Sequence, residues 1–99
     1  MKLIEEYVNR IEEELEDAEF YAEKFVEYKA KGDMTTANRY KEMSNDELNH
    51  AMNIHSWAVA KIEKISAVYT PPPKMEERWT IAHKNFTHKM GEIKQMLAI

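Results

Sequence analysis

Apolar residues recur at alternating steps of four and three residues along the first third of the chain. They are Ile4, Val8, Ile11, Leu15, Ala18, Ala22 and Phe25. This rhythm places one side chain from each turn on the same face of a helix. The positions between them are mostly charged or polar. The pattern therefore predicts a helix over residues 3–30 that packs against long helical neighbours.

Two further segments follow the first helix. "KAKGDM" interrupts the rhythm, with Gly32 suited to end one helix and Asp33 suited to cap the next. A second helix is expected over residues 34–66, and "TPPPK" ends it because consecutive prolines cannot continue a helix. A third is expected over residues 74–97. Its regularly spaced apolar residues are Met75, Trp79, Ala82, Phe86, Met90, Ile93 and Leu97.

These segments predict one all-α domain over residues 1–99, a long antiparallel helical hairpin joined by a proline elbow to a third helix. The second helix has apolar residues over a wide arc: Leu48, Ala51, Ile54, Trp57, Ala58, Ile62 and Ile65. So wide an arc is typical of bundles with four or more helices. We therefore expect a half-bundle that is completed by dimerisation.

Composition narrows the classes of function. The net charge is −4 and no basic run is present, which argues against a nucleic-acid partner. The absence of cysteine excludes disulfides, zinc–thiolate sites and thiol catalysis. No apolar stretch has the length of a signal peptide or a membrane span, so we expect a cytoplasmic protein without a membrane partner.

Candidate chemistry lies in "NDELNHAM", where Glu47 and His50 are three residues apart in the second helix. At about 100° per residue, Glu47 is expected at the centre of the apolar stripe and His50 about 60° to one side. A buried carboxylate is costly unless it is paired or binds a metal, and ligands at i and i+3 can converge on one ion. The first helix should supply a further carboxylate, and periodicity narrows the choice only partly, since Glu12, Glu14 and Glu19 flank the apolar seam. The choice among Glu14, Glu16 and Glu19 stays open.

Two stretches resemble a known family: the pair "EL" at residues 14–15, followed by Tyr21, and "DELNHA" at residues 46–51. Together they are similar to the first ligand-bearing hairpin of ferritins, bacterioferritins and rubrerythrins, and the interval 47 − 14 = 33 matches as well. The resemblance implies that Glu14 is a terminal iron ligand, Glu47 a bridging carboxylate and His50 a terminal nitrogen ligand. It also implies that Tyr21 lies beside the metals. These four would be the catalytic residues of a ferroxidase, which oxidises Fe²⁺ to Fe³⁺ for storage or detoxification.

The third segment lacks the second Glu-x-x-His of ordinary ferritin-like domains, so this chain holds half a site. Encapsulated ferritins join two such halves across a dimer axis, and "EELEDAEFY" at residues 13–21 resembles their first ligand helix. The resemblance implies a di-iron centre shared by two subunits, with manganese as an alternative metal. It implies a dimer or a ring of dimers as well, with an encapsulin-type shell as a partner and a nanocompartment in the cytoplasm as the location.

The alternative interpretation is a non-enzymatic helical oligomerisation or interaction module. Any Glu-rich helix produces Glu-x-x-His by chance, and Trp57, Trp79, Phe86 and the methionines are then simply core packing. His55 is expected at the boundary of the bundle, and His83 and His88 are expected at its surface, beside the apolar seam of the third segment. His83 with Glu76 is a candidate for a weak secondary or entry site for metal. Bound iron would distinguish the two interpretations.

Overall fold

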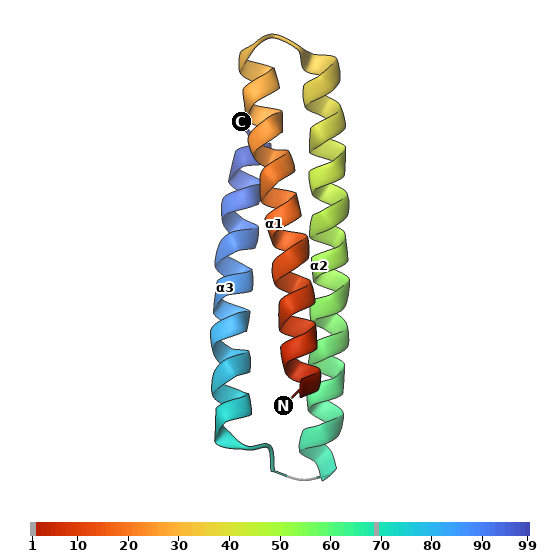
Figure 1. Cartoon of the computed structure of the whole chain (residues 1–99), viewed down its shortest axis with the longest axis vertical. Coiled ribbons are helices and arrows are strands. Elements are labelled where there is room, and N and C mark those ends of the chain that lie inside the picture. The colour runs from red at the N-terminus through yellow and green to blue at the C-terminus, as the bar shows by residue number, and fades with distance from the viewer. Residues whose placement is uncertain (1, 69) are drawn as a thin grey trace.

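A computed structural model describes residues 2–68 and 70–99, and these form three helices without a strand (Figure 1). The helices are α1 (Lys2–Ala30), α2 (Met34–Val68) and α3 (Pro73–Leu97). The expected bounds 3–30, 34–66 and 74–97 are therefore correct to within two residues. α3 begins one residue early because proline is well suited to the first turn, where its missing N–H is not needed. The all-α prediction is confirmed.

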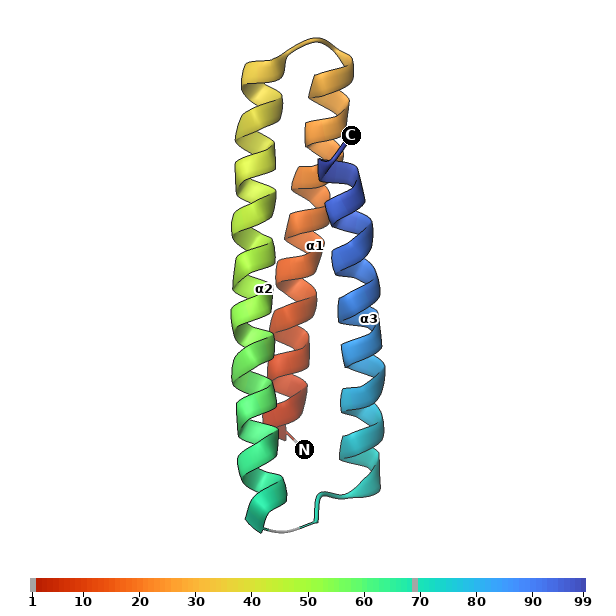
Figure 2. The same ribbon diagram turned by 180° about the vertical axis from the view of Figure 1, so that it is seen from behind.

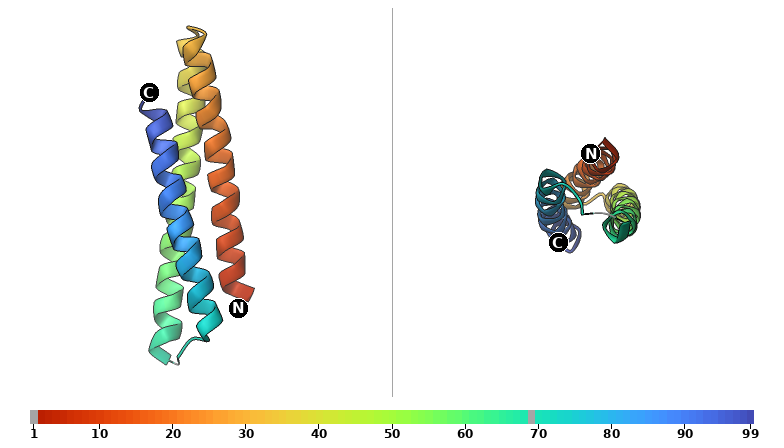
Figure 3. Two further views of the ribbon diagram at one scale, coloured as in Figure 1. Left: turned by 90° about the vertical axis from the view of Figure 1, so that its left-hand side faces the viewer. Right: turned by 90° about the horizontal axis from the view of Figure 1, so that it is seen from below.

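The three helices form an elongated bundle of about 55 × 18 × 17 Å. α1 and α2 run antiparallel, and α3 returns along α1, so that its C-terminal end lies near the turn between α1 and α2 (Figures 1 and 2). The end view in Figure 3 places the helices at the corners of a triangle. α1 packs along both of the other helices, whereas α2 and α3 have little backbone contact with each other. α1 is therefore the central helix of an open bundle.

The turn between α1 and α2 forms as the sequence predicts. Gly32 has a φ of 81°, a left-handed conformation that glycine adopts without strain. The Asp33 carboxylate accepts a hydrogen bond from the Thr36 N–H at 3.1 Å and so caps α2. This hydrogen bond also holds the pKa of Asp33 below its ordinary value. Both roles predicted for this turn are confirmed.

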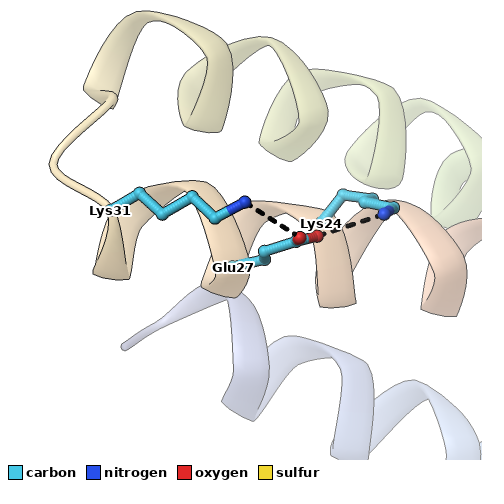
Figure 4. A network of polar contacts seen from close by, with 3 residues as sticks. All are labelled: Lys24, Glu27 and Lys31. Carbon is cyan, nitrogen blue, oxygen red and sulfur yellow. Dashed lines mark hydrogen bonds and ion pairs between the residues drawn. The ribbon is translucent and has the colours of Figure 1, made fainter.

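Exposed charges support the last turns of α1. Glu27 accepts hydrogen bonds from Lys24 at 3.1 Å and from Lys31 at 3.2 Å (Figure 4). These two lysines lower the pKa of Glu27. Because all three side chains are well exposed, we interpret this network as modest support for the helix rather than as a binding site.

The core lies along α1. All seven residues of its predicted apolar stripe are buried. Ala18 and Ala22 are completely inaccessible to solvent, as is Ala51 on α2, so the two helices approach closely at this level. There the buried Ser44 hydroxyl donates a hydrogen bond of 2.7 Å to the Ala18 carbonyl. The hairpin is thus a tightly packed and well-defined support for side chains that project beside this contact.

α3 packs less uniformly than α2. Its buried residues are near its two ends: Met75, Met90, Ile93 and Leu97. In the middle of the helix Trp79 and Phe86 are only half-buried, and a pocket of about 350 Å³ lies between α1 and α3. Ion pairs add further links to α1, from Arg78 to Glu5 at 3.0 Å and from Lys89 to Glu19 at 2.6 Å.

The prediction that Trp57 and all methionines are core residues is wrong for the single chain. Trp57 is 62% exposed, and Met34, Met43 and Met52 are exposed as well. The reason is that α2 has one close helical neighbour, which covers only part of its wide apolar arc. Met1 lies outside the described residues. Of these exposed residues, Met43 and Trp57 share one side of α2, whereas Met34 and Met52 lie on another side.

Candidate metal centre on the hairpin

Glu14 on α1 and Glu47 and His50 on α2 bring their side chains together. Each residue offers one ligand atom, and these atoms all lie within 4.8 Å of one another. His50 Nδ1 is 3.5 Å from a Glu14 carboxylate oxygen and 3.7 Å from a Glu47 carboxylate oxygen. Within residues 2–68 and 70–99, no other group of three His, Asp or Glu side chains is arranged so that it could hold a metal ion. The structure therefore assembles the three residues that the resemblance implies as ligands.

The local packing explains why these side chains meet. Glu14 is one turn before Ala18, and Glu47 follows Ser44, whose hydroxyl is bonded to the Ala18 carbonyl, by three residues. Because the helices are antiparallel, both carboxylates lie on the same side of this contact (Figure 1). Leu15, beside Glu14, is buried in the core and limits the rotation of α1 about its own axis. The i, i+3 relation then brings His50 to the same side of α2 as Glu47.

The structure distinguishes the three first-helix carboxylates that the sequence leaves open. Glu19 is engaged by Lys89 of α3 at 2.6 Å. Glu16 is exposed and lines the pocket between α1 and α3. Glu14 alone of the three joins the cluster with α2, and its side chain is only 20% exposed.

The expected position of Glu47 at the centre of the buried stripe is wrong for the single chain. Its side chain is 21% exposed, and that of His50 is 56% exposed. The buried residues of α2 are instead Ala37, Ser44, Leu48, Ala51, Ile54 and Ala58. Because α1 covers only one side of the predicted arc, Glu47 lies at the edge of the contact and His50 lies outside it.

The carboxylates influence each other's protonation. The pKa of Glu47 is raised to about 7, first by its hydrogen bond with Glu14, then by burial and by the negative charge of Glu14. His50 opposes this shift. Between pH 4.5 and about 7, Glu47 therefore retains a proton that an ordinary glutamate has lost. A cation could take the place of that proton, and carboxylate oxygens with one imidazole nitrogen suit Fe²⁺ or Mn²⁺. The donor set thus fits the metals that the resemblance implies.

This pKa shift predicts how the stability of the metal-free protein depends on pH. The folded pKa of Glu47, about 7, exceeds the ordinary value of 4.5, so between these values the folded state binds more protons than the unfolded state. The free energy of unfolding should then fall as the pH rises through this window. Glu47→Gln keeps a neutral side chain and should remove the effect. We expect the variant to match the wild type at pH 4.5 and to be about 1–2 kcal/mol more stable at pH 8, after allowance for solvent screening.

Thermal melts of both proteins in a chelator, at a series of pH values, measure this difference. Glu42→Gln is a matched control, because Glu42 is an exposed glutamate on the same helix. A stability difference between Glu47→Gln and the wild type that is the same at every pH would contradict the raised pKa of Glu47.

Tyr21 is placed differently from the three clustered residues. It lies two helical turns after Glu14 on α1 and is half-buried. Its ring stacks against Tyr40 at 6.1 Å between centroids, and Tyr40 stacks on Tyr28 at 5.7 Å. A role for Tyr21 beside bound metals stays a prediction.

The cluster opens onto the exposed side of α2 that carries Met43 and Trp57. Trp57 is on the same side of α2 as His50, two turns further on, and Met43 precedes His50 by two turns. A shallow hollow beside Trp57 is lined by both apolar and charged residues, namely Leu3, Glu6, Tyr7, Arg10 and Ile54. His50 thus lies between two exposed apolar side chains, and the exposed Asp46 and Asn53 are on the same side of α2. Exposed apolar side chains beside a ligand cluster are the arrangement expected of a site that a second protein surface completes.

No helix within the described part of the chain combines the length and the apolar character needed to cross a membrane. Comparisons with protein-family models, with curated proteins and with solved structures found no match to this chain. The candidate site therefore stands on its own geometry.

Proposed function

We propose that the protein is a ferroxidase-type di-iron protein of the ferritin-like kind, which binds Fe²⁺ between two subunits and oxidises it to Fe³⁺. The observation that carries this proposal is the convergence of ligand atoms from Glu14, Glu47 and His50 within 4.8 Å. These atoms come from two helices, and a rigid hairpin supports them.

Each residue has a role suited to its chemistry. Glu47 would bridge two ions, because its carboxylate has two oxygens and lies close to both Glu14 and His50. Glu14 would hold one ion as a terminal ligand, and its hard oxygens stabilise Fe³⁺ after oxidation. The His50 imidazole would help to retain Fe²⁺ before oxidation.

Iron is the substrate in this reaction, and two ions give one electron each to a shared oxidant. With O₂ and two protons the product is hydrogen peroxide. With hydrogen peroxide and two protons the products are two water molecules. Either stoichiometry needs two Fe²⁺ ions near one oxidant, which is the reason that a bridging carboxylate matters.

One chain supplies too few ligands for two ions, so the proposal includes a second copy. The exposed side of His50 and the apolar residues beside it leave room for a symmetric partner, whose own Glu14, Glu47 and His50 would complete the coordination. A dimer this small encloses no space for iron mineral. A ring of dimers or an encapsulin-type shell would then receive the oxidised iron.

Oxidation of Fe²⁺ in air tests the proposal. Metal-free protein is mixed with Fe²⁺ under anaerobic conditions, air is admitted, and the absorbance of Fe³⁺ is followed. We expect oxidation well above the rate in protein-free buffer. A rate equal to that of the buffer would reject a ferroxidase, and slower oxidation in the presence of Mn²⁺ would indicate competition for the same site.

A second function is favoured by one specific observation, the exposed apolar side chains on the hairpin. Trp57 is 62% exposed and Phe20 is 50% exposed, which is unusual for large aromatic residues. A non-enzymatic helical interaction module would use them to bind another helix. Such a module would purify without stoichiometric iron and would not need Glu14 or His50.

A further inference from the structure

A histidine pair joins α2 to α3 away from the carboxylate cluster. His55 Nε2 on α2 and His83 Nδ1 on α3 are 2.9 Å apart. Among the described residues this is the one side-chain hydrogen bond between these two helices. Two imidazole nitrogens that face each other at this distance share a single proton, because one must donate and the other must accept.

The surroundings hold His55 in place and leave the pair accessible. His55 stacks on Phe86, with ring centroids 4.3 Å apart and ring planes within 10° of parallel. Trp79 lies beside it at 5.3 Å between centroids. His55 is half-buried, and burial together with the neighbouring His83 lowers its pKa, so its ring stays neutral near pH 7. His83 is exposed to solvent. One nitrogen ligand is thus held by its neighbours, and the other is free to adjust.

The distances suit a metal between the two rings. Nitrogen ligands lie about 2.0–2.1 Å from Zn²⁺, so two of them in a tetrahedral site are about 3.3 Å apart. The observed separation of the nitrogens is 2.9 Å, and the ring centroids are 5.0 Å apart. A small rotation of the exposed His83 ring would turn both lone pairs toward a common ion. Neither backbone would have to move far.

We propose that His55 and His83 form a two-histidine binding site for a transition-metal ion of the Zn²⁺ type. The ion would take the place of the proton between the nitrogens, and that proton would move to the other nitrogen of the ring that donated it, which stays neutral. Water would fill the remaining positions of the ion. Imidazole suits Zn²⁺ and its neighbours, whereas Mg²⁺ and Ca²⁺ prefer oxygen ligands. This site uses none of the residues of the proposed iron centre and does not depend on that function.

The ion would link the two helices that are otherwise least connected. α3 is held mainly against α1, and its middle is packed loosely. A metal bound to both α2 and α3 would close this side of the bundle. Because the ion would bind only when both histidines are in place, it would stabilise the folded chain by mass action.

The chain has four histidines, which allows a clean test. The background variant His50→Ala/His88→Ala leaves only His55 and His83. Calorimetric titration of this background with Zn²⁺ alone should give one ion per chain, and its melting temperature should rise with the Zn²⁺ concentration. Adding His83→Ala should weaken binding at least tenfold, since one imidazole cannot chelate.

Lys84→Ala in the same background is the matched control, an exposed residue of α3 next to His83, and should leave binding unchanged. Circular dichroism checks that each variant is folded. Ring signals in NMR provide a second measurement that needs no further substitution: both histidines should shift together with Zn²⁺. Equal affinity in the His83→Ala variant, or a shift of only one ring, would overturn the proposal.

Discussion

Glu47→Ala is expected to lower the rate of Fe²⁺ oxidation at least about 100-fold. Changes to groups that merely orient a ligand already reduce metal affinity or activity by about 10–100-fold, so loss of a bridging ligand should do more. The measurement is the appearance of Fe³⁺ on exposure to air, with wild type and variant at the same protein and iron concentrations. Glu16→Ala is the matched control, because Glu16 is an exposed glutamate two residues from Glu14 and outside the cluster.

The fold of the Glu47→Ala variant should be retained or become slightly more stable. Glu14 no longer faces a second carboxylate, and removal of a partly buried charge is often neutral or stabilising. His50→Ala should weaken Fe²⁺ binding with little change in stability, since His50 is 56% exposed. If the cluster were only a hydrogen-bonded structural group, both variants would instead lose about 1–3 kcal/mol of stability and keep the same oxidation rate. That pattern would end the ferroxidase interpretation.

Fe²⁺ is expected to drive association of the chains. An ion that binds only between two subunits stabilises the associated state, and at 100 times its dissociation constant it contributes about 2.7 kcal/mol. Each bound ion therefore lowers the dimer dissociation constant by about 100-fold, and the proposed dimer binds two ions. Anaerobic sedimentation velocity at low protein concentration, with and without Fe²⁺, measures the change.

Glu14→Gln serves as the control for this experiment, because it removes one proposed ligand but leaves the exposed apolar side chains intact. We expect the variant to associate equally with and without Fe²⁺. An unchanged distribution for the wild type at saturating Fe²⁺ would mean that any iron site lies within one subunit. Association that is strong and independent of metal would favour the interaction module.

The sequence predicts most of the fold because the fold follows local rules. The apolar stripe of α1 is regular and α1 packs on two sides, so every predicted stripe residue is buried. Gly32 and Asp33 act through their own backbone and nearest neighbours. The pattern does not reveal which part of a wide arc is covered. The pattern therefore predicts a core position for Trp57, although its side chain is 62% exposed in the single chain.

The candidate site is predictable in part for the same reason. Glu47 and His50 share a helix, so their proximity follows from the i, i+3 spacing. The choice of Glu14 depends on contacts between helices, in particular the pairing of Glu19 with Lys89, which no periodicity encodes. The meeting of His55 and His83 depends on how α3 lies against α2. No residue near His55 or near His83 in the sequence predicts that these two side chains meet.

Anaerobic binding stoichiometry tests whether two half-sites combine into one di-iron centre. Metal-free protein is titrated with Fe²⁺ in the absence of oxygen, in the His55→Ala/His83→Ala background so that the histidine pair cannot contribute. We predict a sharp endpoint at one Fe²⁺ per chain, two per dimer, and its loss when Glu14 or Glu47 is also replaced. An endpoint at two ions per chain, or no saturable binding at all, would contradict the shared site.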